Sequence, residues 1–256
     1  MKRQKHLSVP LIAALLGGSL AGGCASIDSD QETHFQALLT KGQAYMERNK
    51  PQQALPSLRE AQQIHPDDPE VLSNLGLAYS RLGQSQAALE SLKKAYALKS
   101  DDPGILHNLG VAYLQEGDLE NAEATLTKVS VVPSFNDRAS AWNNLAIVYR
   151  KKNQPQKVVS ALQQAIRIDP SHVPSHLALA AHYHQSSQPD QERLHLEQIA
   201  ALEPDNIEIL EQLGNNLANN GRKDQAKIVF RRMIQSHSDH PAAQRARGRL
   251  LEIEQP

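Results

Sequence analysis

The chain contains a single cysteine in 256 residues, and aromatic residues make up only 4% of it. One cysteine cannot form a disulfide within the chain, so the stability of the fold has to come from packing. The apolar residues are mainly Leu, Ala, Ile and Val, rather than the Val, Tyr and Thr that are frequent in β-sandwiches. This composition favours an all-α protein with small residues in its interior.

The sequence also lacks a strong excess of charge and a long apolar run. Lys and Arg number 27 and Asp and Glu 28, which gives a formal net charge of −1. This balance argues against a nucleic-acid partner, because such a partner favours a basic protein surface. The main apolar run, residues 7–16, is too short for a membrane-spanning helix, which needs about 20 residues.

The only cysteine follows a segment that has the features of a secretory signal peptide. Lys2, Arg3 and Lys5 precede the apolar run, and mostly small residues follow it. The stretch LAGGC, which ends at Cys24, resembles the bacterial lipobox, in which the cysteine is lipidated and becomes the first residue of the mature protein. We therefore predict a signal peptide at 1–23, removed on maturation, and a lipidated tether at 24–34. Ordinary cleavage that leaves the thiol unmodified is the alternative.

The residue after Cys24 bears on the location of the mature protein. Lipoproteins retained in the inner membrane commonly carry aspartate there, whereas this chain has Ala25. By resemblance to this sorting rule, we expect an outer-membrane lipoprotein that faces the periplasm, anchored stably because several acyl chains hold a membrane better than one. Residues 24–256 have 24 Lys and Arg against 28 Asp and Glu, a formal charge of −4.

The rest of the chain contains six copies of a pattern with a period of about 34 residues. A small residue recurs in each copy, with successive spacings of 34, 34, 36, 34 and 34. Twelve residues later five copies have Ala or Val and one has Glu192, and four residues further on comes Leu or Phe. The small residues are Gly42, Gly76, Gly110, Ala146, Ala180 and Gly214.

This pattern resembles the tetratricopeptide repeat, whose signature is W-x2-L-G-x2-Y, then A-x3-F, then P. Trp142, Leu145, Ala146 and Tyr149 form the fullest copy of its first half. Gly or Ala at the eighth position lets the first helix of a repeat approach the second, and short breaks such as Gly83-Gln84 supply the turn between them.

We therefore predict an all-α fold, a right-handed α-solenoid of six tetratricopeptide repeats with a C-terminal capping helix. The repeats are expected within 35–240, at 35–68, 69–102, 103–138, 139–172, 173–206 and 207–240, and the cap at 241–256. Such an array needs a solvated end. In the cap, Arg245, Arg247 and Arg249 are expected to form an exposed charged face, with a partner site as the alternative.

We find no set of residues in the sequence that would support catalysis. Among the eleven histidines, His182 and His184 are two residues apart and so point to different faces of a helix, and no H-E-x-x-H motif is present. A Gly-rich phosphate loop and a G-x-S-x-G motif are also lacking. We predict a protein that is not an enzyme, that uses no cofactor or metal, and whose histidines are polar surface residues.

The candidate partner-binding groove follows the first helices of the repeats. Asn74, Asn108 and Asn144 occupy one position in repeats 2 to 4, and their amides could donate to and accept from the backbone of an extended peptide. The alternative is that these asparagines only bridge adjacent helices. The other candidates are an apolar strip and two cations beside this ladder, namely Leu77, Val111, Leu114, Ile147, Arg81 and Arg150.

The junction between repeats 3 and 4 is longer than the others. Val131-Val132-Pro133 should end the second helix of repeat 3 early, because proline lacks an N–H and disfavours helix in the residue before it. The lipobox, the six repeats and this two-residue expansion together resemble the type IV pilus pilotins of the PilF/PilW/Tgl group. That family carries an aromatic residue followed by charged residues before the fourth repeat, and Phe135, Asp137 and Arg138 stand at the matching places.

This resemblance implies a function. It implies that the protein helps the pilus secretin reach the outer membrane and form multimers there, with acylated Cys24 as the membrane anchor and the groove as the site for the protein partner. Two alternatives use the same fold, namely an adaptor lipoprotein for peptidoglycan enzymes or proteases and a scaffold for the export of envelope polysaccharide. We expect no nucleic-acid partner and no small-molecule substrate.

Overall fold

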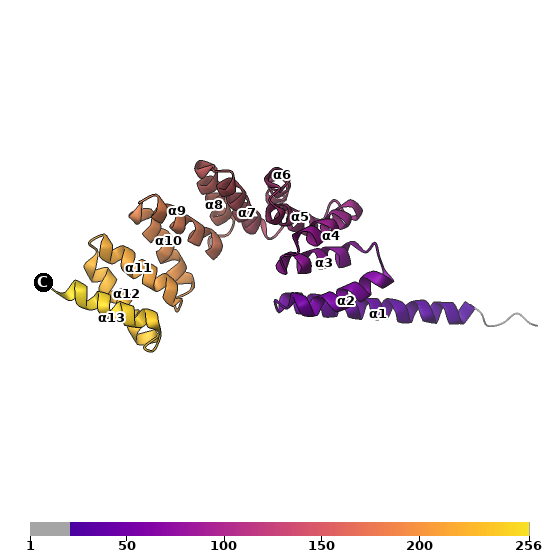
Figure 1. Ribbon diagram of the computed structural model, residues 1–256, viewed down its shortest axis with the longest axis horizontal. Helices are drawn as coiled ribbons and strands as arrows, with labels where there is room; N and C mark the ends of the chain where they lie inside the picture. Colours follow the sequence, from indigo (N-terminus) through magenta and orange to yellow (C-terminus); the bar gives the residue numbers. More distant parts are fainter. Residues whose placement is uncertain (1–20, 256) are drawn as a thin grey trace, which may run out of the picture. The chain divides into compact units, whose positions relative to one another are not determined.

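The computed structural model describes residues 21–255, and the side chains of residues 29–255. Residues 1–20 of the predicted signal peptide and the side chain of Cys24 therefore lie outside the described part. Thirteen α-helices and no strand are found in this part, which confirms the all-α repeat fold (Figure 1). The helices are α1 (Ala21–Glu47), α2 (Pro51–Ile64), α3 (Pro69–Arg81), α4 (Ser85–Leu98), α5 (Pro103–Glu116), α6 (Leu119–Ser130), α7 (Arg138–Lys151), α8 (Pro155–Ile168), α9 (Val173–Gln185), α10 (Pro189–Leu202), α11 (Ile207–Asn219), α12 (Lys223–Ser236) and α13 (Pro241–Glu254).

The chain forms two compact units. The first ends at Pro66 and contains α1 and α2, and the second begins at Asp67 and contains α3 to α13, which are repeats 2 to 6 and the capping helix. In the first unit α1 buries Phe35, Leu38 and Met46, and it extends back to Ala21 through the predicted tether. Within 21–255, no helix combines the length and the apolar character that crossing a membrane requires.

The helix ends follow local sequence signals. The Asp68 carboxylate accepts a hydrogen bond from the Val71 N–H at 2.8 Å, and Asp102 caps α5 in the same way, each just before a proline in the first helical turn. Gly83 and Gly117 have φ angles of 70° and 87° at the turns within repeats 2 and 3. Helix α6 ends at Ser130, as the Val-Val-Pro sequence predicts.

The small residue at the eighth position sets the distance between the two helices of a repeat. A Cβ atom on Gly76 would lie 2.5 Å from Leu92 Cγ, and one on Gly214 would lie 2.5 Å from Phe230 Cε1. Because carbon atoms do not pack this closely, these helices could not approach as they do with a larger residue. Repeats 4 and 5 have Ala146 and Ala180 there, both nearly fully buried.

Helix α9 joins two parts of the hydrophobic core of the second unit. Leu179 belongs to a cluster of buried residues with Leu145 and Leu162 of repeat 4. The next residue, Ala180, belongs to a second cluster, which contains Phe230 and continues into the capping helix. Repeat 5 is therefore the place where the packing of the array changes from one core to the other.

Candidate functional site

Two asparagines of the predicted ladder bind within the chain. The Asn144 Nδ2 atom donates to His107 Nε2 in the preceding repeat at 3.1 Å, and Asn74 Nδ2 donates to the Glu70 carbonyl oxygen at 2.9 Å. Asn108 is half-buried on α5. Asn144 thus makes the bridge between adjacent helices that was the alternative interpretation of the ladder.

The apolar strip is less accessible than the sequence suggests. Leu114 is only 7% exposed, because it packs into the core cluster that contains Leu126 and Leu145. It is therefore a core residue and does not offer surface to a partner. Val111 is half-buried and also packs against this cluster, while Leu77 is half-buried on α3. Arg81, at the end of α3, is exposed.

The residues of the junction contact repeat 3. Phe135 packs against the cluster of Leu106, Val129 and Ala141, and its ring centroid lies 5.3 Å from that of His107. Burial lowers the pKa of His107, and the exposed Asp137 partly opposes this shift. A neutral His107 can accept the hydrogen bond from Asn144, so Phe135 is linked to the ladder through this histidine. Arg138 is the half-buried first residue of α7.

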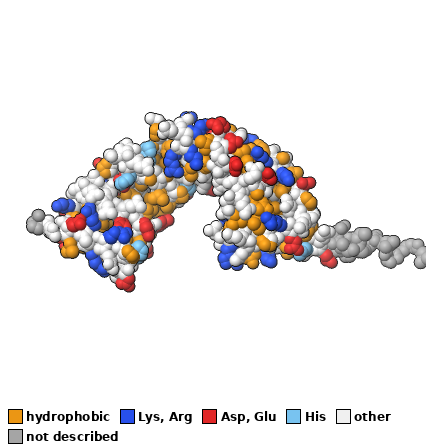
Figure 2. Space-filling view, viewed as in Figure 1, with side chains coloured by type: hydrophobic (Ala, Val, Ile, Leu, Met, Phe, Trp, Pro, Cys, Tyr) orange, Lys and Arg blue, Asp and Glu red, His pale blue; other side chains and the backbone are white. Residues whose placement is uncertain are grey.

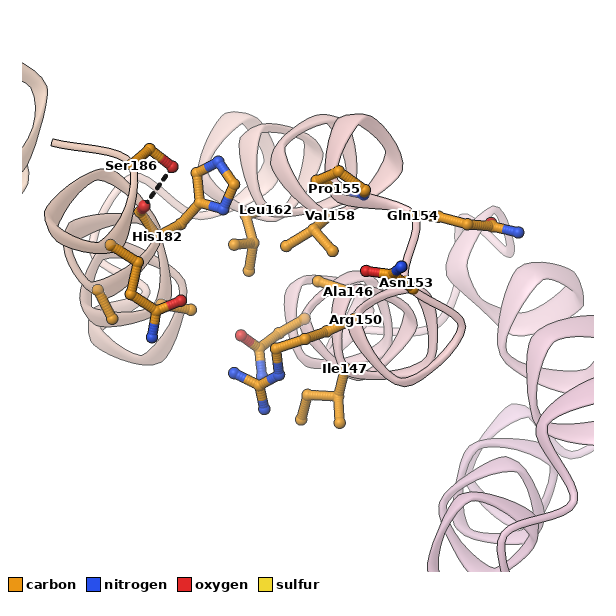
Figure 3. A pocket seen from close by; sticks show the side chains of 14 residues that line it. Ala146, Ile147, Arg150, Asn153, Gln154, Pro155, Val158, Leu162, His182 and Ser186 are labelled. Atoms are coloured by element: carbon orange, nitrogen blue, oxygen red, sulfur yellow. Dashed lines mark hydrogen bonds between the residues drawn. The ribbon is translucent and has the colours of Figure 1, made fainter. Parts of the chain in front are cut away.

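Ile147 and Arg150 line a cavity of about 260 Å³ between repeats 4 and 5, which we call the Arg150 pocket (Figure 3). Val158 and Leu162 of α8 form its apolar wall together with Ala146 of α7, and His182 faces them from α9. The Ser186 hydroxyl, at its edge, donates to the His182 carbonyl oxygen at 2.8 Å. The pocket therefore combines an apolar wall with a few polar groups, as binding sites commonly do.

The Arg150 pocket has a positive charge that the protein does not neutralise. None of its fourteen lining residues is acidic, and among the side chains of residues 29–255 we find no ion pair of the Arg150 guanidinium. On the face of the second unit seen in Figure 2, basic and acidic side chains are interspersed rather than gathered by sign. The pocket thus favours an anionic group locally.

A second cavity, which we call the amide pocket, lies between repeats 5 and 6 and has a volume of about 680 Å³. Ala180, Ala181 and Pro189 contribute its apolar surface, Glu192 contributes a carboxylate and His184 an imidazole. This pocket was not predicted from the sequence, because the predicted asparagine ladder covers only repeats 2 to 4. Most of its lining residues are amides, namely Gln185, Gln188, Gln212, Asn215, Asn216, Asn219 and Asn220.

Repeat 5 also has a polar interior that the sequence analysis missed. His176 is 4% exposed, donates from Nε2 to the Pro170 carbonyl oxygen at 3.0 Å, and has its Nδ1 atom 3.0 Å from Nδ1 of His195. Burial, together with the smaller effect of nearby His176, lowers the pKa of His195 to about 4. His176 is therefore not the surface residue that we predicted. Its place at the fourth position of the repeat, where Leu72 and Leu106 stand in other copies, was the available signal.

The cap arginines bind within the chain. Arg245 makes two hydrogen bonds to the Glu211 carboxylate, at 2.6 and 2.7 Å, and Arg249 donates to Asn219 and Glu252. Arg247 donates to the Ser238 carbonyl oxygen. Among the described side chains, those of residues 29–255, no group of three or more from His, Cys, Asp or Glu is arranged to hold a metal ion.

A known protein family matches most of the chain. A family model for the cilia and flagella-associated protein 70 C-terminal domain, a tetratricopeptide-repeat domain, matches residues 11–250. The chain belongs to this family. No curated protein matches the chain.

Solved structures of similar fold include two pilus proteins. PilF of Pseudomonas aeruginosa has a TM-score of 0.67 at 18% identity, over 86% of this chain and 99% of that one. PilW, described as a widely conserved type IV pilus biogenesis factor, has a TM-score of 0.68 at 17% identity, over 82% and 97%. MamA of Desulfovibrio magneticus has a TM-score of 0.56 at 24% identity, over 68% and 97%. At these identities the likeness shows the fold alone.

Proposed function

We propose that this protein is an outer-membrane lipoprotein that binds a protein partner and promotes the localisation and multimerisation of a type IV pilus secretin. The observation that carries the proposal is the fit to whole proteins, since the chain covers 99% of PilF and 97% of PilW rather than an isolated run of repeats. The lipobox-like stretch that ends at Cys24 supports it independently.

In the proposed mechanism, the lipidated N-terminus and the repeats have separate roles. Acyl groups on Cys24 supply affinity for the membrane, and the repeats supply affinity for the protein partner. A partner held by an anchored carrier has a raised effective concentration at the bilayer, which favours assembly there. The role needs no bond to be made or broken in the partner. The Arg150 pocket is the candidate site, because it offers a cavity and a cation with no acidic residue among those that line the pocket.

The most direct test is deletion of the gene, followed by blotting for heat- and detergent-resistant secretin multimers and scoring of surface pili. We expect both to be lost and to return when the wild-type gene is supplied. Unchanged multimers in the deletion strain would refute the pilotin role.

A second test separates membrane attachment from folding. Cys24→Ala should leave a protein with wild-type helicity by circular dichroism that no longer sediments with membranes and no longer supports secretin multimers. Ala25→Asp should move the protein to the inner membrane, whereas the control Ser29→Ala should fractionate as wild type. Outer-membrane localisation of the Ala25→Asp variant would contradict the sorting argument.

A further inference from the structure

The Arg150 pocket and the amide pocket are parts of one groove. Ala181 and Gln185 of α9 line both cavities, so the two meet across this helix. Asn215 of α11 lines the amide pocket and also a third cavity, of about 290 Å³, beside the capping helix. A groove therefore runs past α7, α9 and α11 to α13, over the half of the array that follows the predicted ladder.

The middle of this groove presents amides that the protein does not use. Asn216, Asn219 and Asn220 are engaged, since each makes a side-chain hydrogen bond at 2.7–3.1 Å. For the four remaining amides of the pocket, in the part of the chain that the structure describes, we find no side-chain hydrogen bond. They are Gln185, Gln188, Gln212 and Asn215. Each offers a carbonyl acceptor and two N–H donors to whatever enters the groove.

Such a set of groups matches a polypeptide main chain. An extended segment exposes N–H and C=O groups in alternation, and amides can pair with both whatever the side chains are. Nucleic-acid bases stack best on Phe, Tyr and Trp, and none of these lines the Arg150 pocket or the amide pocket, whose only aromatic rings are the imidazoles of His182 and His184. A glycan ligand would likewise find no Phe, Tyr or Trp ring in these pockets to pack against. The lining thus favours a protein segment.

The two ends of the groove differ in charge, which determines where an acidic side chain of the segment would lie. At the Arg150 end, the guanidinium has no acidic neighbour among the lining residues. At the cap end, Arg245 pairs with Glu211 at 2.6 Å and Arg249 with Glu252 at 2.7 Å, so these cations are already neutralised. Near the middle, Glu192 is paired with His184 at 3.0 Å. An acidic group on the ligand would therefore find its partner at the Arg150 end.

We propose that this groove binds an extended segment of a protein partner, with its main chain held by the four unused amides and an acidic side chain paired with Arg150. The proposal rests on the proposed function only in that the array binds a protein, and it holds for any such partner. It moves the contact region from repeats 2 to 4 to repeats 4 to 6.

The test measures peptide binding to the detergent-solubilised full-length protein by fluorescence anisotropy. The probes are three pools of synthetic random peptides, amidated at the C-terminus, with one Asp, one Asn or one Lys at a fixed position. We expect the Asp pool to bind most tightly. In the peptide that binds most tightly, methylation of central main-chain nitrogens should weaken binding. It removes N–H groups that would donate hydrogen bonds to the side-chain amide oxygens of the groove.

Matched variants separate the two parts of the groove. Arg150→Glu should weaken the Asp pool by about fivefold and remove its advantage over the Asn pool. Gln212→Ala with Asn215→Ala should weaken all pools about threefold to tenfold. The controls Arg232→Glu and Gln163→Ala, at exposed positions on α12 and α8, should bind as wild type.

Several outcomes would overturn the proposal. They are binding that tolerates main-chain methylation and equal binding of all three pools. Capture of glycan fragments in place of peptides would overturn it as well. Because no secretin is present in this assay, peptide binding and the loss of secretin multimers on gene deletion can fail separately.

Discussion

Repeats 2 and 5 have the same helical framework and different interiors. Leu92 and Leu196 are fully buried at the same position of the second helix. At the fourth position of the repeat, however, repeat 2 has Leu72, which is 1% exposed, and repeat 5 has His176, which is 4% exposed. Where repeat 2 has the buried Ala88, repeat 5 has Glu192. The fold thus depends strictly on a few packing positions and accepts polar groups at others.

The polar groups of repeat 5 are accepted because they bind one another. Glu192 accepts hydrogen bonds from Asn216 at 2.9 Å and from His184 at 3.0 Å, and the ring of His195 stacks on Tyr183 with centroids 5.7 Å apart. A buried polar network is tolerated when its members are satisfied and costly when they are not. The Arg150 pocket and the amide pocket lie on either side of this repeat, along α9. The less apolar interior therefore coincides with the candidate binding region.

The most severe test of this comparison gives repeat 2 the histidine of repeat 5. In Leu72→His, the imidazole would enter the cluster of Ala95 and Ile105 without the carbonyl and histidine partners that His176 has. We expect a loss of about 3–5 kcal/mol in the free energy of unfolding, from lost apolar burial and an unsatisfied polar group. Urea unfolding monitored by circular dichroism measures it.

The reverse substitution is the control. His176→Leu restores the residue type of the other repeats and leaves His195 without one neighbour, so we expect a change within about 1 kcal/mol in either direction. If Leu72→His were as mild as His176→Leu, the polar network of repeat 5 would not be what makes a buried histidine acceptable.

The next test uses pH and concerns His195. Its folded-state pKa of about 4 lies below the value of about 6.5 expected in the unfolded chain. Between these values the unfolded chain binds a proton that the folded protein does not, so acidification through this window lowers stability. We expect this group to contribute about 1–2 kcal/mol, after a reduction for solvent screening of a half-buried ring.

The measurement is the urea midpoint at a series of pH values from 7 to about 4. His195→Gln should flatten the profile relative to wild type, whereas His34→Gln, which changes an exposed ring in the first unit, should not. Carboxylates with lowered pKa values, such as Glu123 and Glu211, weaken both proteins at acid pH, so the difference between the two profiles is the quantity to compare. Parallel profiles would show that His195 does not titrate as described.

The sequence was sufficient for the fold because the repeat pattern depends on residues that act locally. The spacing of Gly76 and Leu92 determines how two helices pack, and Asp68 and Gly83 determine where helices begin and end. The use of groove residues was harder to predict. Whether Asn144 is free or bound to His107, and whether Leu114 is surface or core, depends on how one repeat is placed against the next. Periodicity gives the position of a side chain on its helix and does not give that placement.

The mildest test concerns Glu192, which stands where Ala88 and Ala226 are fully buried in other repeats. Glu192→Ala removes the acceptor of Asn216, but Asn216 Nδ2 keeps the Pro189 carbonyl oxygen at 3.1 Å. We therefore expect a loss of only about 1 kcal/mol in the free energy of unfolding. A double-mutant cycle with Asn216→Ala isolates the pair, and its coupling energy should account for most of that loss. A coupling energy of zero would mean that Asn216 does not stabilise Glu192, which would then interact favourably with His184 at most. The polar interior would in that case not extend from the histidines to the amide pocket.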